Sequence, residues 1–97
     1  MPVYNFTTID DPSASGAQTF ANGINDTDQI VGWYIDKDGR THGYIFDSDS
    51  GTYTTLDDPF GAGGTFAGGI NDRGLVAGSY AESFLGRYHG FLYDGRI

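Results

Sequence analysis

An internal repeat constrains this chain more than any other feature of its sequence. The stretch TFANGINDTDQIVGWY at Thr19–Tyr34 returns as TFAGGINDRGLVAGSY at Thr65–Tyr80, so the repeating unit is about 46 residues long (65 − 19 = 46). A second match, FTTIDDP at Phe6–Pro12 and YTTLDDP at Tyr53–Pro59, carries the repeat into the N-terminal segment. Because a unit of this length cannot bury its apolar face alone, neighbouring units must pack on one another.

The composition favours short strands joined by tight turns. The 97 residues include 16 Gly, 7 Tyr and 7 Phe, and no segment has a long helix-forming run. Aromatic residues favour strands, whereas Gly, Asn and Asp favour turns. We therefore expect residues 1–97 to form a single all-β repeat domain without helices.

Each repeat is predicted to form a four-stranded antiparallel meander. The first repeat covers about residues 19–59 and the second about residues 65–97. The strands expected in the first are Thr19–Ile24, Gln29–Ile35, Thr41–Asp47 and the YTTLDD stretch that begins at Tyr53. The second repeat contains counterparts of the first three strands and stops where the turn to a fourth should come. Apolar residues on both faces of Gln29–Ile35 indicate a strand sandwiched between sheets.

The N-terminal stretch Val3–Pro12 is predicted to be a strand of the fourth type, separated from the sheet to which it belongs. The strand types then follow one another along the chain in the order fourth, first, second, third, and this order occurs twice. The last strand, Tyr88–Asp94, therefore lacks a neighbour. Strand 3–12 of a neighbouring chain could complete that last meander.

Four-stranded units of this size are typical of β-propeller blades. Propellers contain roughly 4–8 blades, so two blades cannot close a ring. An open pair would also expose apolar faces and unpaired strand edges. We expect head-to-tail association into a homo-oligomeric ring, with a six-bladed trimer preferred over a four-bladed dimer or an eight-bladed tetramer. The alternative is a fragment that extends, aggregates or swaps strands.

The charge argues against two classes of partner. The formal net charge is −8, with only five Lys and Arg residues together, so neither nucleic acid nor an anionic membrane surface is expected as a partner. The absence of cysteine excludes a disulfide framework and thiolate metal ligands. No stretch has the pattern of a membrane span or a signal peptide.

Several polar residues could suggest chemistry, but each has a simpler interpretation. His42 and His89 are equivalent and could form a ring of metal ligands or bases; we expect them instead to bond backbone or loop acceptors between blades. The pairs Asp10-Asp11 and Asp57-Asp58 are expected to cap the turns before proline, because adjacent strand residues point to opposite faces. No serine is marked for a catalytic triad. We expect no catalytic residue, no metal, no cofactor and no enzymatic activity.

Two turns resemble the start of calcium loops. They are the Asp36-Asp38-Gly39 and Asp47-Asp49-Gly51 turns, which lack the third spaced ligand and the distal glutamate of an EF-hand. Solvated turns explain both patterns.

A ligand site could be built from aromatic and charged side chains on the blades. Aromatic faces stack on sugar rings while Arg and Glu bond hydroxyl groups, and weak sites repeated around a ring gain avidity. The candidates are Trp33, Tyr34, Arg40, Tyr80, Glu82 and Arg87. This predicts multivalent binding of a carbohydrate or similar polar ligand in inter-blade clefts. The alternative is that the aromatic residues form an inter-blade core and that the protein is a structural or interaction scaffold.

The repeated motifs resemble those of the bacterial extracellular HAF-type repeats. The similarity lies in TFANGIND, VGWY, THGYIFD and TTLDDP, which stand in that family's order and cover nearly the whole chain. The resemblance implies a β-propeller-like architecture and an extracellular or periplasmic setting. It implies no reaction and no catalytic residues, because the family has none assigned.

Overall fold

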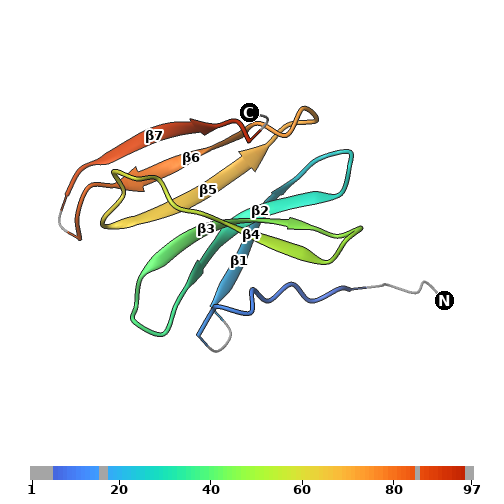
Figure 1. Ribbon diagram of the computed structural model, residues 1–97, viewed down its shortest axis with the longest axis horizontal. Coiled ribbons are helices and arrows are strands. Elements are labelled where there is room, and N and C mark those ends of the chain that lie inside the picture. Colours follow the sequence, from blue (N-terminus) through green and yellow to red (C-terminus); the bar gives the residue numbers. More distant parts are fainter. Residues whose placement is uncertain (1–5, 16–17, 85, 96–97) are drawn as a thin grey trace.

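The computed structural model describes residues 6–15, 18–84 and 86–95, which form strands, turns and loops but no helix (Figure 1). Seven strands make two antiparallel sheets, and each sheet is a simple meander. Sheet A contains β1 (Thr19–Ile24), β2 (Gln29–Ile35), β3 (Thr41–Asp47) and β4 (Thr52–Leu56); sheet B contains β5 (Gly64–Ile70), β6 (Val76–Ala81) and β7 (Tyr88–Tyr93). The expected all-β class and the four-plus-three division of strands are confirmed.

The hairpin turns form where the sequence places residues that accept a left-handed backbone. Asp28 has a φ of 61° and its counterpart Gly74 has a φ of 81°. Each turn is closed by a backbone bond, from Asn25 N to Gln29 O at 3.1 Å and from Asn71 N to Leu75 O at 3.0 Å. Asp and Gly are suited to these positions because they adopt positive φ at little cost.

The two sheets stack face to face, and the hydrophobic core lies between them. Val31 and Leu56 of sheet A meet Ala67 and Val76 of sheet B. The partly buried residues around this cluster are Ile45, Ile70, Phe91 and Tyr93. The expectation that β2 is sandwiched is confirmed on its Val31 face, where the side chain is fully buried.

A glycine in each second strand makes room for an aromatic ring from the third. Gly32 pairs with Tyr44, and Gly78 pairs with Phe91. The hydroxyl of Tyr44 continues across to donate to the carbonyl oxygen of Phe20 at 3.0 Å. A Cβ atom at Gly78 would lie 2.9 Å from the Phe91 ring and 2.2 Å from a backbone oxygen. The glycines of VGWY and AGSY are therefore steric requirements of the sheet.

The N-terminal segment lies along the side of sheet A that faces away from sheet B (Figure 1). The bonds that hold it there include those from Asp11 N to Thr19 Oγ1 at 3.2 Å and from Ser15 N to Ile35 O at 2.9 Å. Residues 6–10 form no strand within the chain, and residues 3–5 of the predicted strand Val3–Pro12 lie outside the described residues. The physical reason is that this part of the segment is largely exposed and runs along a sheet face, away from an open strand edge.

Replacing Gly32 by Ala should destabilise the fold strongly. The added Cβ would lie 1.8 Å from the carbonyl oxygen of Phe20, so the paired strands would have to separate. We expect a loss of about 3 kcal/mol or more in the free energy of unfolding, measured by urea denaturation. Gly69→Ala is the control, because a Cβ there meets nothing within 4 Å. Equal stability of both variants would contradict this account of the glycine.

Candidate functional site

The GIND turns of the two repeats are joined by a ladder of hydrogen bonds. Asn25 Nδ2 donates to Asn71 O at 2.9 Å, and Asp26 N donates to Asp72 Oδ1 at 2.9 Å. Each bond joins residues that occupy the same position in consecutive repeats. The hydrogen bond from Asp72 and the charge of its carboxyl raise the pKa of Asp26. The ladder therefore fixes the register in which one sheet stacks on the next.

The asparagine of GIND also holds its own turn. Asn25 Oδ1 accepts the backbone N–H groups of Gln29 at 2.9 Å and Thr27 at 3.1 Å. Asn71 Oδ1 accepts those of Leu75 and Arg73, both at 3.0 Å. One amide therefore closes a hairpin with its oxygen and, in the first repeat, reaches the next repeat with its nitrogen.

His42 is held between two carboxylates at one end of sheet A. Its Nε2 lies 2.7 Å from Asp36 Oδ2, and its Nδ1 lies 2.7 Å from Asp57 Oδ1. The ring also stacks on Tyr34 with centroids 5.1 Å apart. Ionised carboxylates only accept hydrogen bonds, so satisfying both requires both ring nitrogens to donate, which is the protonated form of histidine.

The electrostatics of this cluster follow from its geometry. Burial alone would lower the pKa of His42, but the hydrogen bonds to Asp36 and Asp57 outweigh burial and raise the pKa above its ordinary value. The hydrogen bond from His42 in turn lowers the pKa of Asp36. The two shifts favour the charged pair.

The second repeat repeats this arrangement in part. His89 Nε2 lies 2.7 Å from Glu82 Oε2, and the His89 ring stacks on Tyr80 at 5.1 Å. Among the described residues, no carboxylate reaches the other ring nitrogen of His89. The second repeat thus has the aromatic and one acid of the site, without the counterpart of Asp57.

Both histidines stand out in the sequence, but their partners differ from those predicted. Backbone or loop acceptors between blades are expected, whereas the structure places His42 against the carboxylates of Asp36 and Asp57, beside strands of its own sheet. The available signal was an acid at the start of the preceding turn in both repeats, Asp36 and Glu82. Asp57 carried no such signal, because its approach to His42 depends on the pairing of β3 with β4.

The predicted aromatic site residues lie among other rings. Trp33 stacks on Phe20 with centroids 4.2 Å apart and meets Phe66 edge-on at 5.2 Å. Tyr34 is buried, and its hydroxyl lies 3.3 Å from Thr55 Oγ1. Tyr80 is half-buried against His89, as described above. One ring face of Trp33 is thus in contact with Phe20, and the residue makes a second aromatic contact with Phe66.

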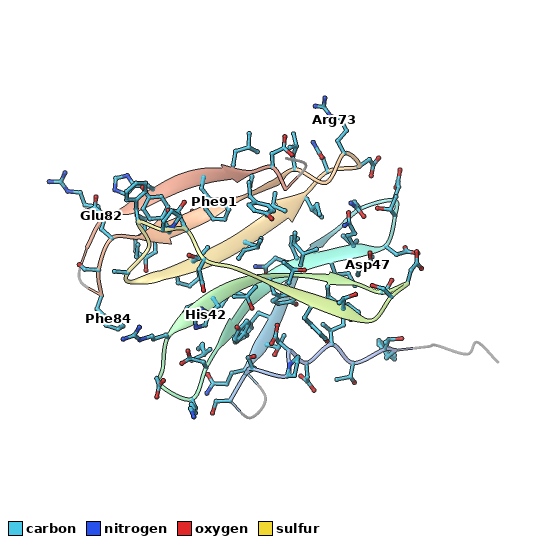
Figure 2. The ribbon with its side chains drawn as sticks, in the orientation of Figure 1. His42, Asp47, Arg73, Glu82, Phe84 and Phe91 are labelled. Carbon is cyan, nitrogen blue, oxygen red and sulfur yellow. The ribbon has the colours of Figure 1, made fainter. Side chains whose placement is uncertain are left out.

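Of the predicted charged residues, Arg40 lines a cleft with other polar and aromatic groups. This cleft has a volume of about 160 Å³, and its wall includes Arg40, His42, Asp57 and Phe84. Figure 2 shows His42 and Phe84 at the same end of the two sheets. The remaining candidates, Glu82 and Arg87, are exposed at the turn between β6 and β7.

A larger cleft opens at the opposite end of the two sheets. Its volume is about 480 Å³, and it is lined by Asp47 and Asp72 together with Arg73, Gln29 and Tyr93. Asp47 and Arg73 lie at the end away from His42 in Figure 2. Both clefts therefore combine acidic and basic groups at the margins of the stacked sheets.

The acidic turns bind their own backbone. The carboxylates of Asp11 and Asp58 accept the N–H groups of Ser13 and Phe60, each at 2.9 Å, which confirms the predicted role as turn caps for these two. Asp57, predicted to do the same, instead lies 2.7 Å from His42 Nδ1. Asp36 caps its own turn in the same way, through bonds to Asp38 N and Arg40 N. Within the described ranges, no group of three or more His, Cys, Asp and Glu side chains is arranged to hold a metal ion.

Comparisons of the chain with protein-family models, curated proteins and solved structures gave no match. The part of the chain that the structure describes has no helix long and apolar enough to cross a membrane.

Replacing His42 by Gln should cost more stability in mild acid than in alkali. Because the pKa of His42 is raised in the fold, its contribution to stability is fully present below pH 6.5, the ordinary pKa of histidine. That contribution is lost as the pH rises through the raised pKa. The pKa of Asp36 is lowered, so its contribution to stability is present above pH 3.8 and is lost on further acidification. Thermal unfolding at about pH 5.5 and about pH 9 measures the difference.

The control for this experiment is Lys37→Gln, which removes an exposed charge from the same turn. It should change stability little at either pH. A His42→Gln loss that is equal at both pH values would contradict the charged cluster.

Proposed function

We propose that this chain is a non-enzymatic repeat unit that assembles itself head to tail into a closed β-propeller. Two four-stranded blades per chain would give six blades in a trimer, which is the preferred ring. The unit would act as a multivalent binding module for a carbohydrate or similar polar ligand in its inter-blade clefts. The resemblance to HAF-type repeats supports this architecture and an extracellular or periplasmic setting.

The observation that carries the proposal is that each sheet exposes, on its outer face, an apolar residue equivalent to one packed inside the chain. On sheet B, the face turned away from sheet A carries Leu92, which is 69% exposed and is the counterpart of Ile45 beside the core. On sheet A, the face turned away from sheet B carries Ile24, which is 62% exposed and is the counterpart of Ile70. A second copy can therefore repeat the contact between sheets A and B at either end.

The hydrogen-bond ladder supports the same assembly. Asn71 occupies the position from which Asn25 reaches the next repeat. In a head-to-tail ring, Asn71 would donate to the backbone of Asn25 of the next copy, with the geometry already present inside the chain. Such a contact is heterologous, and it closes when the rotation per unit divides the circle.

The binding role is supported by the cleft beside His42. Arg40 supplies hydrogen-bond donors and Asp57 supplies acceptors, while Phe84 provides an apolar wall. A hydroxylated ligand uses such a combination, and repetition around a ring would raise avidity. The candidates Glu82 and Arg87 would flank the cleft from the neighbouring turn.

The second candidate function is a structural scaffold without a ligand of its own. It is favoured by the packing of Trp33 and Tyr34, whose rings contact Phe20, Phe66 and His42. Aromatic residues used in this way stabilise the stack and leave little free ring surface for a sugar.

Replacing Leu92 by Lys should prevent assembly while leaving the chain folded. Light scattering over a dilution series should give the mass of three chains for the wild type, or of two or four chains if the ring has another size. The variant should give the mass of one chain. The reason is that a charge would be buried in the repeated contact. Phe84→Lys, a loop change at a residue that is 77% exposed, should keep the wild-type mass. A folded wild-type monomer at all concentrations would contradict the proposal.

The ligand prediction is tested on a glycan array with the assembled protein. Arg40→Ala should reduce binding at least tenfold by removing a charged donor from the cleft, without changing the mass in solution. Lys37→Ala is the matched control, because it removes a nearby charge that does not line the cleft. An assembled ring that binds no glycan would leave the scaffold as the better account.

A further inference from the structure

The histidine site is complete in the first repeat and half complete in the second. His42 has an acid on each ring nitrogen, Asp36 and Asp57, both at 2.7 Å. His89 has Glu82 at 2.7 Å on Nε2, and no other described residue supplies a carboxylate to Nδ1. The two sites are otherwise alike, since the ring centroids of the stacked tyrosine and histidine lie 5.1 Å apart in both.

The missing acid is the one that follows a fourth strand. Asp57 comes directly after Leu56, the last residue of β4, and β4 pairs with β3 to bring Asp57 to His42. Sheet B has no fourth strand among its described residues. The sequence FTTIDDP at 6–12 repeats YTTLDDP at 53–59, so Asp10 is the counterpart of Asp57.

The N-terminal segment of the same chain is placed away from His89. It lies on the far side of sheet A from sheet B (Figure 1), and Asp11 N is tied to Thr19 Oγ1. The same bond, from Asp58 N to Thr65 Oγ1, ties the end of β4 to the start of β5. Residues 6–9 are thus placed against sheet A as β4 is placed against sheet B. They therefore lie where sheet B of another copy would stack on sheet A.

We infer that Asp10 of a second copy of this chain bonds Nδ1 of His89, completing a histidine–carboxylate site across the subunit boundary. Residues 6–9 of that copy would pair antiparallel with β7 as its fourth strand. The inference rests on the proposed head-to-tail assembly and adds to it the residue by which the partner completes the site.

The internal sheet predicts the register of this pairing. In sheet A, Ile45 pairs with Thr54 and Tyr44 pairs with Thr55. Moving each residue by the repeat spacing gives the pairs Gly90 with Ile9, Phe91 with Thr8, Leu92 with Thr7, and Tyr93 with Phe6. The open edge of β7 and the unpaired residues 6–9 are both available in the described chain.

Cysteine cross-linking tests the register directly, because the chain has no cysteine of its own. Directly paired residues of antiparallel strands lie about 4.5–5.5 Å apart at Cα, which suits a disulfide. The double variant Thr7→Cys, Leu92→Cys should oxidise to covalent multimers on a non-reducing gel. Thr8→Cys with Leu92→Cys should not, since adjacent strand residues point to opposite faces. Ile45→Cys with Thr54→Cys is the internal positive control.

The acid is tested by comparing two equivalent substitutions. Asp10→Asn should raise the concentration at half-dissociation roughly tenfold or more, because the carboxylate charge that strengthens the hydrogen bond is lost at the boundary. Asp57→Asn removes the equivalent charge inside the chain, so it should lower the melting temperature instead and leave the dissociation midpoint unchanged. Circular dichroism checks that both variants remain folded.

The outcomes separate this inference from the assembly itself. Register-specific multimers together with weakened assembly of Asp10→Asn support it. A ring whose cysteines do not cross-link and whose dissociation ignores Asp10→Asn would overturn the inference and leave the assembly standing. A cysteine pair that closes within one chain would overturn the role of the second copy, and a monomer at every concentration would overturn both.

Discussion

The stacking of one repeat on the next is the interaction on which the rest of this structure depends. Val31 and Leu56 are buried only because Ala67 and Val76 of the second sheet cover them. Neither sheet has enough apolar surface on one face to bury a core alone, since a chain of this length buries only about 60–65% of its unfolded surface. The fold is therefore a contact between two copies of one unit, and its remaining features refine that contact.

Polar groups decide how the two units are aligned. Apolar packing tolerates small shifts, whereas the bonds from Asn25 to Asn71 O and from Asp26 to Asp72 are satisfied in one register only. The same register brings Arg40 and His42 beside Phe84 at one end of the stack. The clefts are thus products of the stacking and would recur wherever another unit is added.

The apolar residues exposed on the outer faces, Ile24 and Leu92, and the unpaired N-terminal segment have one consequence in common. A chain whose ends present the two halves of its own internal contact is suited to repeat that contact with further copies. The histidine sites show the same incompleteness in chemical form: His42 has both acids, whereas His89 has one. The open edge of β7 and the half-complete site of His89 thus both lie in sheet B.

The sequence by itself determined the strands and turns, and the tertiary structure decided what the side chains contact. The bounds of β1, β2 and β3 agree with the expected ranges because local signals, namely alternation of apolar residues and Asn, Asp and Gly at turns, specify them. The approach of Asp57 to His42 and the packing of Trp33 against Phe66 were not predictable in that way. These contacts join different strands or sheets, so they depend on register and stacking, which only the assembled fold defines.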